Sequence, residues 1–298
     1  ERLFESRTFV NGETIEGKWM PALLQGRERE ALHKASNLQR VYRFDNIAKV
    51  AVGIVTGANK FFLVPNSTVE EYDLSEWAHP MFGRSRQVPG VIYDRAVHAE
   101  NGSTDSPTNF LWFNDVNDKE QLSPKAREYI EAGEEEDLNE RYKCRIRDPW
   151  FEVPSVYSTR LGMLKRSHHY PRLIYNKIGA YTTDTAYRVK SDQYAPQSLS
   201  FSFVNSLTAL SAELEGRHYG GGVLELVPSE IRRLLIPEPI GGEKEIYELD
   251  SRMRKDHDPD ALIRAQDQKI LSNAGISVEE MEAIHSGWLR LRDRRHRV

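Results

Sequence analysis

Cysteine is almost absent from this chain, since Cys144 is the single one among 298 residues. One cysteine excludes an internal disulfide and fits a reducing compartment, so we expect a cytoplasmic protein. Long apolar runs are also missing, and no stretch approaches the roughly 20 residues that a membrane-spanning helix needs. Residues 1–10 lack the basic and apolar regions of a signal peptide, and the chain does not begin with Met. We therefore expect an excised or trimmed piece of a larger protein.

Several signatures of catalysis and metal binding are missing as well. Neither a GxGxxG turn nor a phosphate-binding loop is present, and the glycines at 220–222 lack a following Lys-Ser or Lys-Thr. The chain has no cysteine pair for zinc and no histidine pair at helical spacing with a glutamate. His168 and His169 are adjacent, so on a strand they would point to opposite faces. We predict no catalytic residue, no metal site and no cofactor within this chain.

Cations are scarce relative to acids over most of the chain but not in its middle. Residues 140–177 hold nine Lys and Arg against three acidic residues, which is a net charge of +6, whereas the whole chain carries −4. The remainder therefore carries −10. Such an asymmetry favours a local surface that faces a polyanion, and chance clustering on a solvated face is the alternative.

Short strand-like and helix-like segments are mixed without regular alternation, which predicts an α+β fold with mixed or antiparallel sheets of short strands. We expect flanking helices and a helical C-terminal tail. Ser123-Pro124 opens a helix, Asn205 or Ser206 caps another, and Ser277 with Glu280 forms a capping box. We place a connector at 1–45, the main domain at 46–240 and the tail at 241–298.

Two segments within the basic region supply cations that could contact an anion. Residues 142–147 alternate, which predicts a half-buried strand that exposes Lys143, Arg145 and Arg147. Residues 160–172 are typical of an exposed basic loop. Five of its side chains are candidates for gripping phosphates or entering a groove, with a solvated loop as the alternative: Lys165, Arg166, His168, His169 and Arg172.

Three turns add candidate contacts, each with a structural alternative. Thr56, Asn59 and Lys60 either contact bases and phosphates or form a hairpin turn around Gly57. Residues 176–189 predict a hairpin, in which Asn176 and Thr183 either contact bases or satisfy the turn. Arg217 and Tyr219 precede three glycines, where they either reach a phosphate or belong to a helix cap and tight turn.

Four segments, at 53–65, 142–154, 171–189 and 201–237, occur in an order that resembles one family. Together with the tail they are similar to the target-recognition domain of bacterial N6-adenine DNA methyltransferases of restriction–modification systems. The resemblance implies a DNA-recognition module without a Rossmann-like catalytic domain. The Asn-Pro-Pro-aromatic motif of those enzymes is absent from this sequence.

The resemblance also implies the partners. The chain would bind double-stranded DNA and act with a catalytic methyltransferase domain or subunit, which would hold S-adenosylmethionine. No membrane partner is expected. Two alternatives stay open. The chain is either the recognition part of a fused restriction–methylation enzyme, or a non-enzymatic adaptor whose basic face docks an acidic protein.

Overall fold

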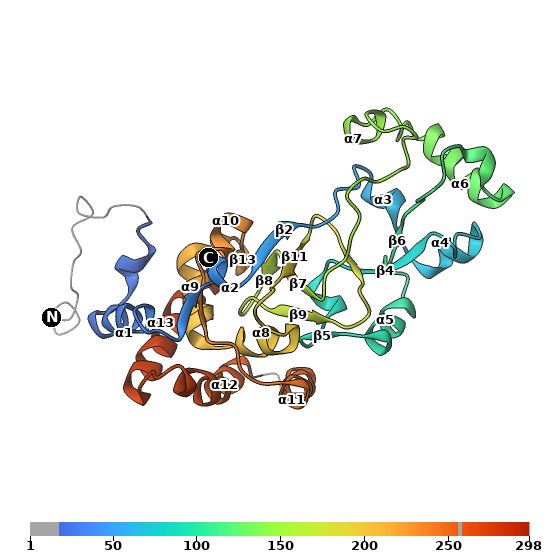
Figure 1. Ribbon diagram of the computed structural model, residues 1–298. Coiled ribbons are helices and arrows are strands. Elements are labelled where there is room, and N and C mark those ends of the chain that lie inside the picture. The colour runs from blue at the N-terminus through green and yellow to red at the C-terminus, as the bar shows by residue number, and fades with distance from the viewer. Residues whose placement is uncertain (1–17, 256–257, 298) are drawn as a thin grey trace.

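The computed structural model describes residues 18–255 and 258–297. Helices α1, α12 and α13 gather at one end of the molecule, and α4, α6 and α7 gather at the other, with sheets between them (Figure 1). We call the second end the distal lobe. No helix within the described ranges is long and apolar enough to cross a membrane.

A five-stranded sheet forms the centre of the fold. It is antiparallel except for the parallel pair of β5 and β9. Its strands are short and mostly buried, as expected for a sheet with elements packed on both faces. In spatial order they are β2 (Lys49–Val52), β11 (Ala186–Lys190), β7 (Leu161–Leu164), β9 (Leu173–Asn176) and β5 (Ile92–Tyr93).

A four-stranded sheet supports the distal lobe. Phe62, Phe110, Phe113 and other aromatic residues fill the core between this sheet and the neighbouring helices. The strands are β10 (Tyr181–Thr182), β4 (Ala78–Phe82), β6 (Asn109–Leu111) and β3 (Leu63–Val64). The helices on this side are α3 (Asn59–Phe62), α4 (Asn66–Glu71), α5 (Arg95–Gly102), α6 (Pro124–Glu135) and α7 (Tyr142–Arg145).

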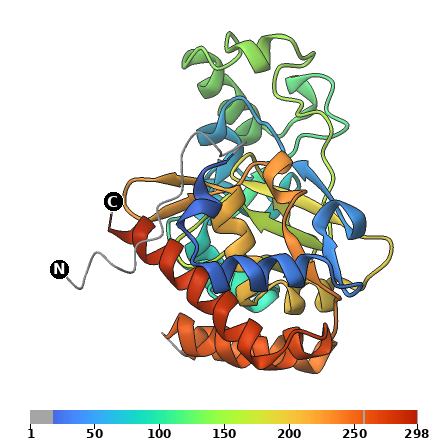
Figure 2. The same cartoon turned by 90° about the vertical axis from the view of Figure 1, so that its left-hand side faces the viewer.

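The helical end is organised around α9 (Ser206–Glu215), which is buried from Ser206 to Leu214. Helix α13 (Val278–His296) packs on α9, and α1 (Gly26–Ser36) lies beside α13 (Figure 2). A shared core that includes Leu210, Ile284 and Trp288 joins these helices. The layer is completed by α8 (Pro196–Ser202), α11 (Glu243–Lys255) and α12 (Pro259–Asn273).

Small elements connect these layers. A three-stranded antiparallel sheet comprises β12 (Arg217–Tyr219), β13 (Val223–Glu225) and β8 (Arg166–Ser167). A two-stranded sheet pairs β1 (Val41–Arg43) with β14 (Leu235–Pro237). The remaining helices are α2 (Phe44–Ile47) and α10 (Pro228–Ile231), with short 3₁₀ turns at Met20–Leu23, Ser85–Gln87 and Lys119–Gln121.

The α+β class and the helical tail are confirmed. The predicted caps are confirmed too, because Asn205, Ser123 and Ser277 each accept a hydrogen bond from a backbone N–H of the following turn. The domain limits stay a prediction. Residues 1–17 of the proposed connector lie outside the described part, and its described residues Leu24, Ala31 and Ala35 pack in the helical core.

The strand predicted for 142–147 is wrong. This segment lies away from any partner strand, so its amides are satisfied locally, with the N–H groups of Cys144 and Arg145 donating to the Arg141 carbonyl. The result is the single helical turn α7. Only Cys144 is buried in it, while Tyr142 and Ile146 are 65% and 63% exposed. Alternation over six residues is too short a pattern to separate a strand from such a turn.

The hairpin predicted for 176–189 is also wrong, because β10 pairs with β4 whereas β11 pairs with β2 and β7. The chain therefore passes from one sheet to the other at Thr183. The loop predicted for 160–172 is wrong in part. Its residues Leu161–Leu164 form the buried central strand β7, and Arg166–Ser167 form β8.

Candidate nucleic-acid interface

The turn that leads from β2 to α3 is built around Gly57. This residue has φ +85°, and a Cβ on it would lie 2.6 Å from the Cβ of Lys143. Only glycine combines that backbone conformation with so close an approach of α7. The turn expected around Gly57 is confirmed, but the hairpin is not, because α3 follows the turn directly.

Thr56 and Asn59 hold this turn together. The Thr56 hydroxyl donates to Asn59 Oδ1 at 2.5 Å, and Asn59 Nδ2 donates to Asp184 Oδ1 at 3.2 Å. Thr56 is buried, whereas Asn59 and Lys60 are exposed. Asn59 and Lys60 therefore point toward solvent, and the buried Thr56 holds Asn59 in place through its hydroxyl hydrogen bond.

Helix α7 brings further cations to the same place. Lys143 Nζ and Arg145 Cζ lie 5.4 and 5.9 Å from the ring centroid of Tyr142, which is largely exposed. Lys60, Arg141, Lys143 and Arg145 are exposed, and none of the carboxylates in the described residues forms an ion pair with them. We name this set, with Asn59 and Tyr142, the α3–α7 surface.

A cleft of about 670 Å³ opens beside this surface, and two arginines bridge its walls. Arg147 donates to the carbonyls of Val55 and Thr56 at 3.1 and 2.7 Å. Arg188 donates to the carbonyls of Val52 and Ser155 and lies 3.6 Å from the Tyr157 ring centroid. Burial lowers the pKa of both arginines below its ordinary value, and guanidinium groups nevertheless stay cationic at neutral pH.

The apolar edge of the cleft is unusual for a surface. Val52 and Val55 are each 45% exposed, and Ile146 lines the same cleft. Exposed apolar side chains beside unpaired cations and an exposed tyrosine form a mixed surface, which suits a ligand with both charge and flat apolar faces. The hydrogen bonds of Arg147 and Arg188 therefore fix the walls of this cleft relative to one another.

A second group of predicted residues lies on or beside the β12–β13–β8 sheet, where its cations form ion pairs with acidic residues. Arg166 and Lys165 contact the buried Glu225 carboxylate at 2.7 and 3.3 Å. Arg217 pairs with Glu230 at 3.0 Å. Tyr219 is 46% exposed at the end of β12. Gly216, before Arg217, has an extended backbone, so the left-handed helix cap considered there is absent.

Three further predicted residues serve the fold. Arg172 Nη1 donates to the carbonyls of Val88 and Gly90 at 2.9 and 2.6 Å. Asn176 is buried, and its amide bonds the backbone of Thr159 and Ala180. Thr183 is buried and makes a bridge with Ile54. Their polar groups are therefore occupied by the protein itself.

The mid-chain cations do not share one face. Lys143 and Arg145 lie on the distal lobe, whereas Lys165 and Arg166 lie at the centre of the molecule, near β8 and β13 (Figure 1). The single anion-facing patch predicted for 140–177 is therefore wrong, because the chain crosses from one lobe to the other within it. Tertiary contacts instead join α7 to the Gly57 turn.

Sequence reasoning missed several residues of this region. Tyr142 and Ile146 were expected on a buried face, and Arg188 was expected only within a strand. His168, predicted as a DNA contact, lies beside His169 and His296. No local pattern marks a tertiary neighbour more than a hundred residues away, so neither Arg188 nor His296 carries a signal in the sequence.

Comparison with known proteins identifies the family. The family "Type II methyltransferase M.Eco57I, C-terminal domain" matches residues 16–271. The type II methyltransferase M.AccI of Acinetobacter calcoaceticus is 24% identical over 197 residues, which are 64% of this chain and 35% of that protein. The chain thus spans about a third of this curated relative.

A solved structure shares the fold. The type IIG restriction endonuclease BpuSI aligns with a TM-score of 0.55 at 14% identity, over 92% of this chain and 33% of the BpuSI chain. The resemblance to a methyltransferase C-terminal domain is therefore confirmed. On the match across residues 16–271, this chain belongs to the family of C-terminal domains of type II methyltransferases related to M.Eco57I.

Proposed function

We propose that this chain is the DNA target-recognition part of an adenine-N6 methyltransferase. The catalytic half, which would bind S-adenosylmethionine, lies outside the chain. The domain would hold double-stranded DNA and deliver one flipped adenine to that catalytic half. The cytoplasm is the compartment in which such a protein meets DNA. The M.Eco57I-type C-terminal family supports the methyltransferase context.

The α3–α7 surface is the observation that carries the proposal. It presents Lys60, Arg141, Lys143 and Arg145 without acidic partners among the described residues, around the exposed ring of Tyr142. Cations left unpaired at close range repel one another, so a polyanion stabilises the arrangement. By contrast, Lys165 and Arg166 both pair with Glu225, and Arg217 pairs with Glu230.

Individual roles follow from side-chain chemistry. Lys143, Arg145 and Lys60 contact phosphates, which sets the position of the duplex without reading its sequence. Asn59 is exposed, and its Oδ1 and Nδ2 already bond Thr56 and Asp184. A contact with adenine in the major groove would use the remaining lone pair and hydrogen of that amide. Arg147 and Arg188 hold the cleft walls, and therefore act on DNA binding through the shape of the site.

A binding series in salt tests this proposal. The chain and a labelled duplex are titrated by fluorescence anisotropy between 50 and 200 mM salt, and we expect log K to fall linearly with log salt. A double variant Lys143→Ala with Arg145→Ala removes two phosphate contacts and lowers the slope by roughly 2.

The matched control removes two cations from a different face, with Lys244→Ala and Lys255→Ala on α11. We expect its slope to stay within experimental error of the unmodified chain. A duplex affinity that ignores salt, or equal effects of the two double variants, contradicts the proposal. If an acidic protein instead binds the chain with unchanged affinity across this salt range, the adaptor alternative is favoured.

The likeness to BpuSI favours the alternative in which the recognition domain belongs to a fused restriction–methylation enzyme. BpuSI is a restriction endonuclease, and the chain matches one third of it. A recognition domain serves methylation and cleavage equally well when both catalytic parts are fused to it. Assaying the full-length gene product for cleavage with a divalent cation, and for methyl transfer, separates a fused enzyme from a lone methyltransferase.

A further inference from the structure

Three histidines meet where the end of α13 reaches the segment between β8 and β9. One nitrogen from each of His168, His169 and His296 lies within 4.8 Å of the other two. The ring centroids of His168 and His296 are 4.5 Å apart, and those of His168 and His169 are 5.0 Å apart. The chain bends at His168–His169 after β8, which is why these neighbours turn to one side.

The protein backbone holds this cluster in place. The carbonyl of His168 accepts a hydrogen bond from His296 Nε2 at 3.0 Å, and that of His169 accepts one from Arg295 at 3.4 Å. Gly222, at φ +71°, closes the cluster from beneath, since a Cβ there would lie 2.9 Å from His296 Cδ2. The three rings are therefore brought together by contacts that do not depend on any bound ligand.

We propose that His168, His169 and His296 bind a transition-metal ion of the zinc type. Neutral imidazole nitrogens are preferred ligands of Zn²⁺, and three of them leave a fourth position for water. The bond from His296 Nε2 to a backbone carbonyl is the outer contact that metal-binding histidines commonly make, and it leaves Nδ1 as the metal-binding nitrogen.

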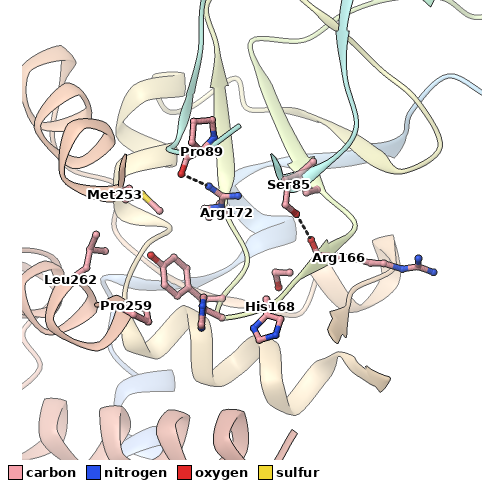
Figure 3. A pocket seen from close by; sticks show the side chains of 12 residues that line it. Ser85, Pro89, Arg166, His168, Arg172, Met253, Pro259 and Leu262 are labelled. Atoms are coloured by element: carbon pink, nitrogen blue, oxygen red, sulfur yellow. Dashed lines mark hydrogen bonds between the residues drawn. The ribbon is translucent and has the colours of Figure 1, made fainter. Parts of the chain in front are cut away.

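The required movement is small. Zinc–nitrogen bonds of about 2.0–2.1 Å place tetrahedral ligand atoms roughly 3.3 Å apart. Binding therefore requires the ligand nitrogens, now up to 4.8 Å apart, to approach one another by about 1.5 Å. A cavity of about 470 Å³ borders His168 and His169. Figure 3 shows His168 on the side of this cavity away from Met253 and Leu262.

The charges around the cluster are compatible with a cation. Arg295 is paired with the buried Glu213 at 2.7 Å, and Arg292 is paired with Asp260 and Asp293. Each imidazole can offer one nitrogen lone pair to a metal ion in its neutral form.

A bound ion would tie the C-terminal end of α13 to the central sheet. His168 and His296 are 128 residues apart in sequence, so the site exists only in the folded chain. Metal binding therefore stabilises the folded state by mass action. The site lies apart from the α3–α7 surface. The result of a zinc-binding test therefore does not depend on whether the chain binds DNA.

Zinc titration of the full 298-residue chain tests the site. After dialysis against a chelator, isothermal titration with ZnCl₂ is expected to give one equivalent, and saturation raises Tm by roughly 3–8 °C. His296→Ala and His169→Ala each weaken binding by about tenfold or more. His33→Ala, an exposed histidine on α1, serves as the matched control and leaves binding unchanged.

Circular dichroism verifies that each variant is folded, and His296→Gln replaces His296→Ala if the latter is not. Three results overturn the site. They are the lack of a saturable equivalent in the unmodified chain, equal zinc affinity in the His296 and His33 variants, and a Tm that zinc does not raise.

Discussion

Glu213 on α9 and Arg295 on α13 form an ion pair in which both side chains are fully buried. Arg295 Nη2 donates to Glu213 Oε1 at 2.7 Å, and Nε donates to Oε2 at 3.1 Å. This two-bond geometry matches the fork of a guanidinium to the two oxygens of a carboxylate. The pair joins the central helix to the C-terminal helix next to His296.

Arg295→Met is therefore expected to destabilise the chain strongly. The substitution keeps the apolar stem but removes the guanidinium from the buried Glu213 and leaves only His218 Nε2, at 3.1 Å, beside the carboxylate, which costs about 3–5 kcal/mol. Urea unfolding at neutral pH measures the loss. Arg297→Met, on an exposed side chain two residues further on, is the control and changes stability by less than about 0.5 kcal/mol. Similar midpoints for both variants would show that the pair contributes little.

Gly57→Ala tests the close contact between the β2–α3 turn and α7. Alanine at φ +85° is strained by about 1–3 kcal/mol, and its Cβ would meet Lys143 at 2.6 Å. Both Tm and duplex affinity are expected to fall, because α7 must move away. Gly26→Ala is the control. A Cβ at Gly26 meets nothing within 4 Å, and the exchange within α1 is neutral or slightly stabilising.

The lowered pKa of the Glu28 carboxylate predicts that the fold loses stability in acid. Burial alone would raise its pKa, but hydrogen bonds from Arg290, the Gln25 N–H and Ser286 outweigh burial and hold the pKa below the ordinary 4.5. Because the folded state has the lower pKa, the stabilisation is complete above pH 4.5 and is lost as pH falls through the folded value.

Thermal unfolding of the unmodified chain and Glu28→Gln measures this effect. The difference in Tm is expected to be largest at neutral pH and to shrink as pH falls below about 4.5, because the unmodified side chain then becomes neutral as well. A gap that stays constant down to pH 3 would refute the role of the ionised carboxylate.

Lys165→Ala with Arg166→Ala distinguishes the two cationic regions. Glu225 already forms ion pairs with both side chains, at 3.3 and 2.7 Å, so their removal is expected to change duplex affinity less than twofold. Glu225→Gln, by contrast, frees both cations and is expected to strengthen non-specific binding in low salt. Anisotropy titrations at one salt concentration make the comparison. If the Lys165–Arg166 pair matters more than Lys143–Arg145, the interface lies on the central sheet.

Prediction from sequence succeeded where the signal is local. The cap at Asn205 and the capping box at Ser277 depend on neighbours within one helical turn, and both were predicted correctly. Prediction failed for 142–147 because a strand needs a partner, and no local pattern says whether a partner strand is near. The hairpin at 176–189 failed for the same reason, since its two strands pair with β4 and with β2 and β7.

The sequence by itself determined the family, the α+β class, the starts of the helices at Ser123, Asn205 and Ser277, and the concentration of cations in mid-chain. Only the tertiary structure decided which cations are available. In the folded chain Arg166 pairs with Glu225, Lys143 packs on Gly57, and His296 lies beside His168. The physical reason is that charge neutralisation and metal coordination depend on distances in space, and residues far apart in the chain acquire those distances only when the core packs.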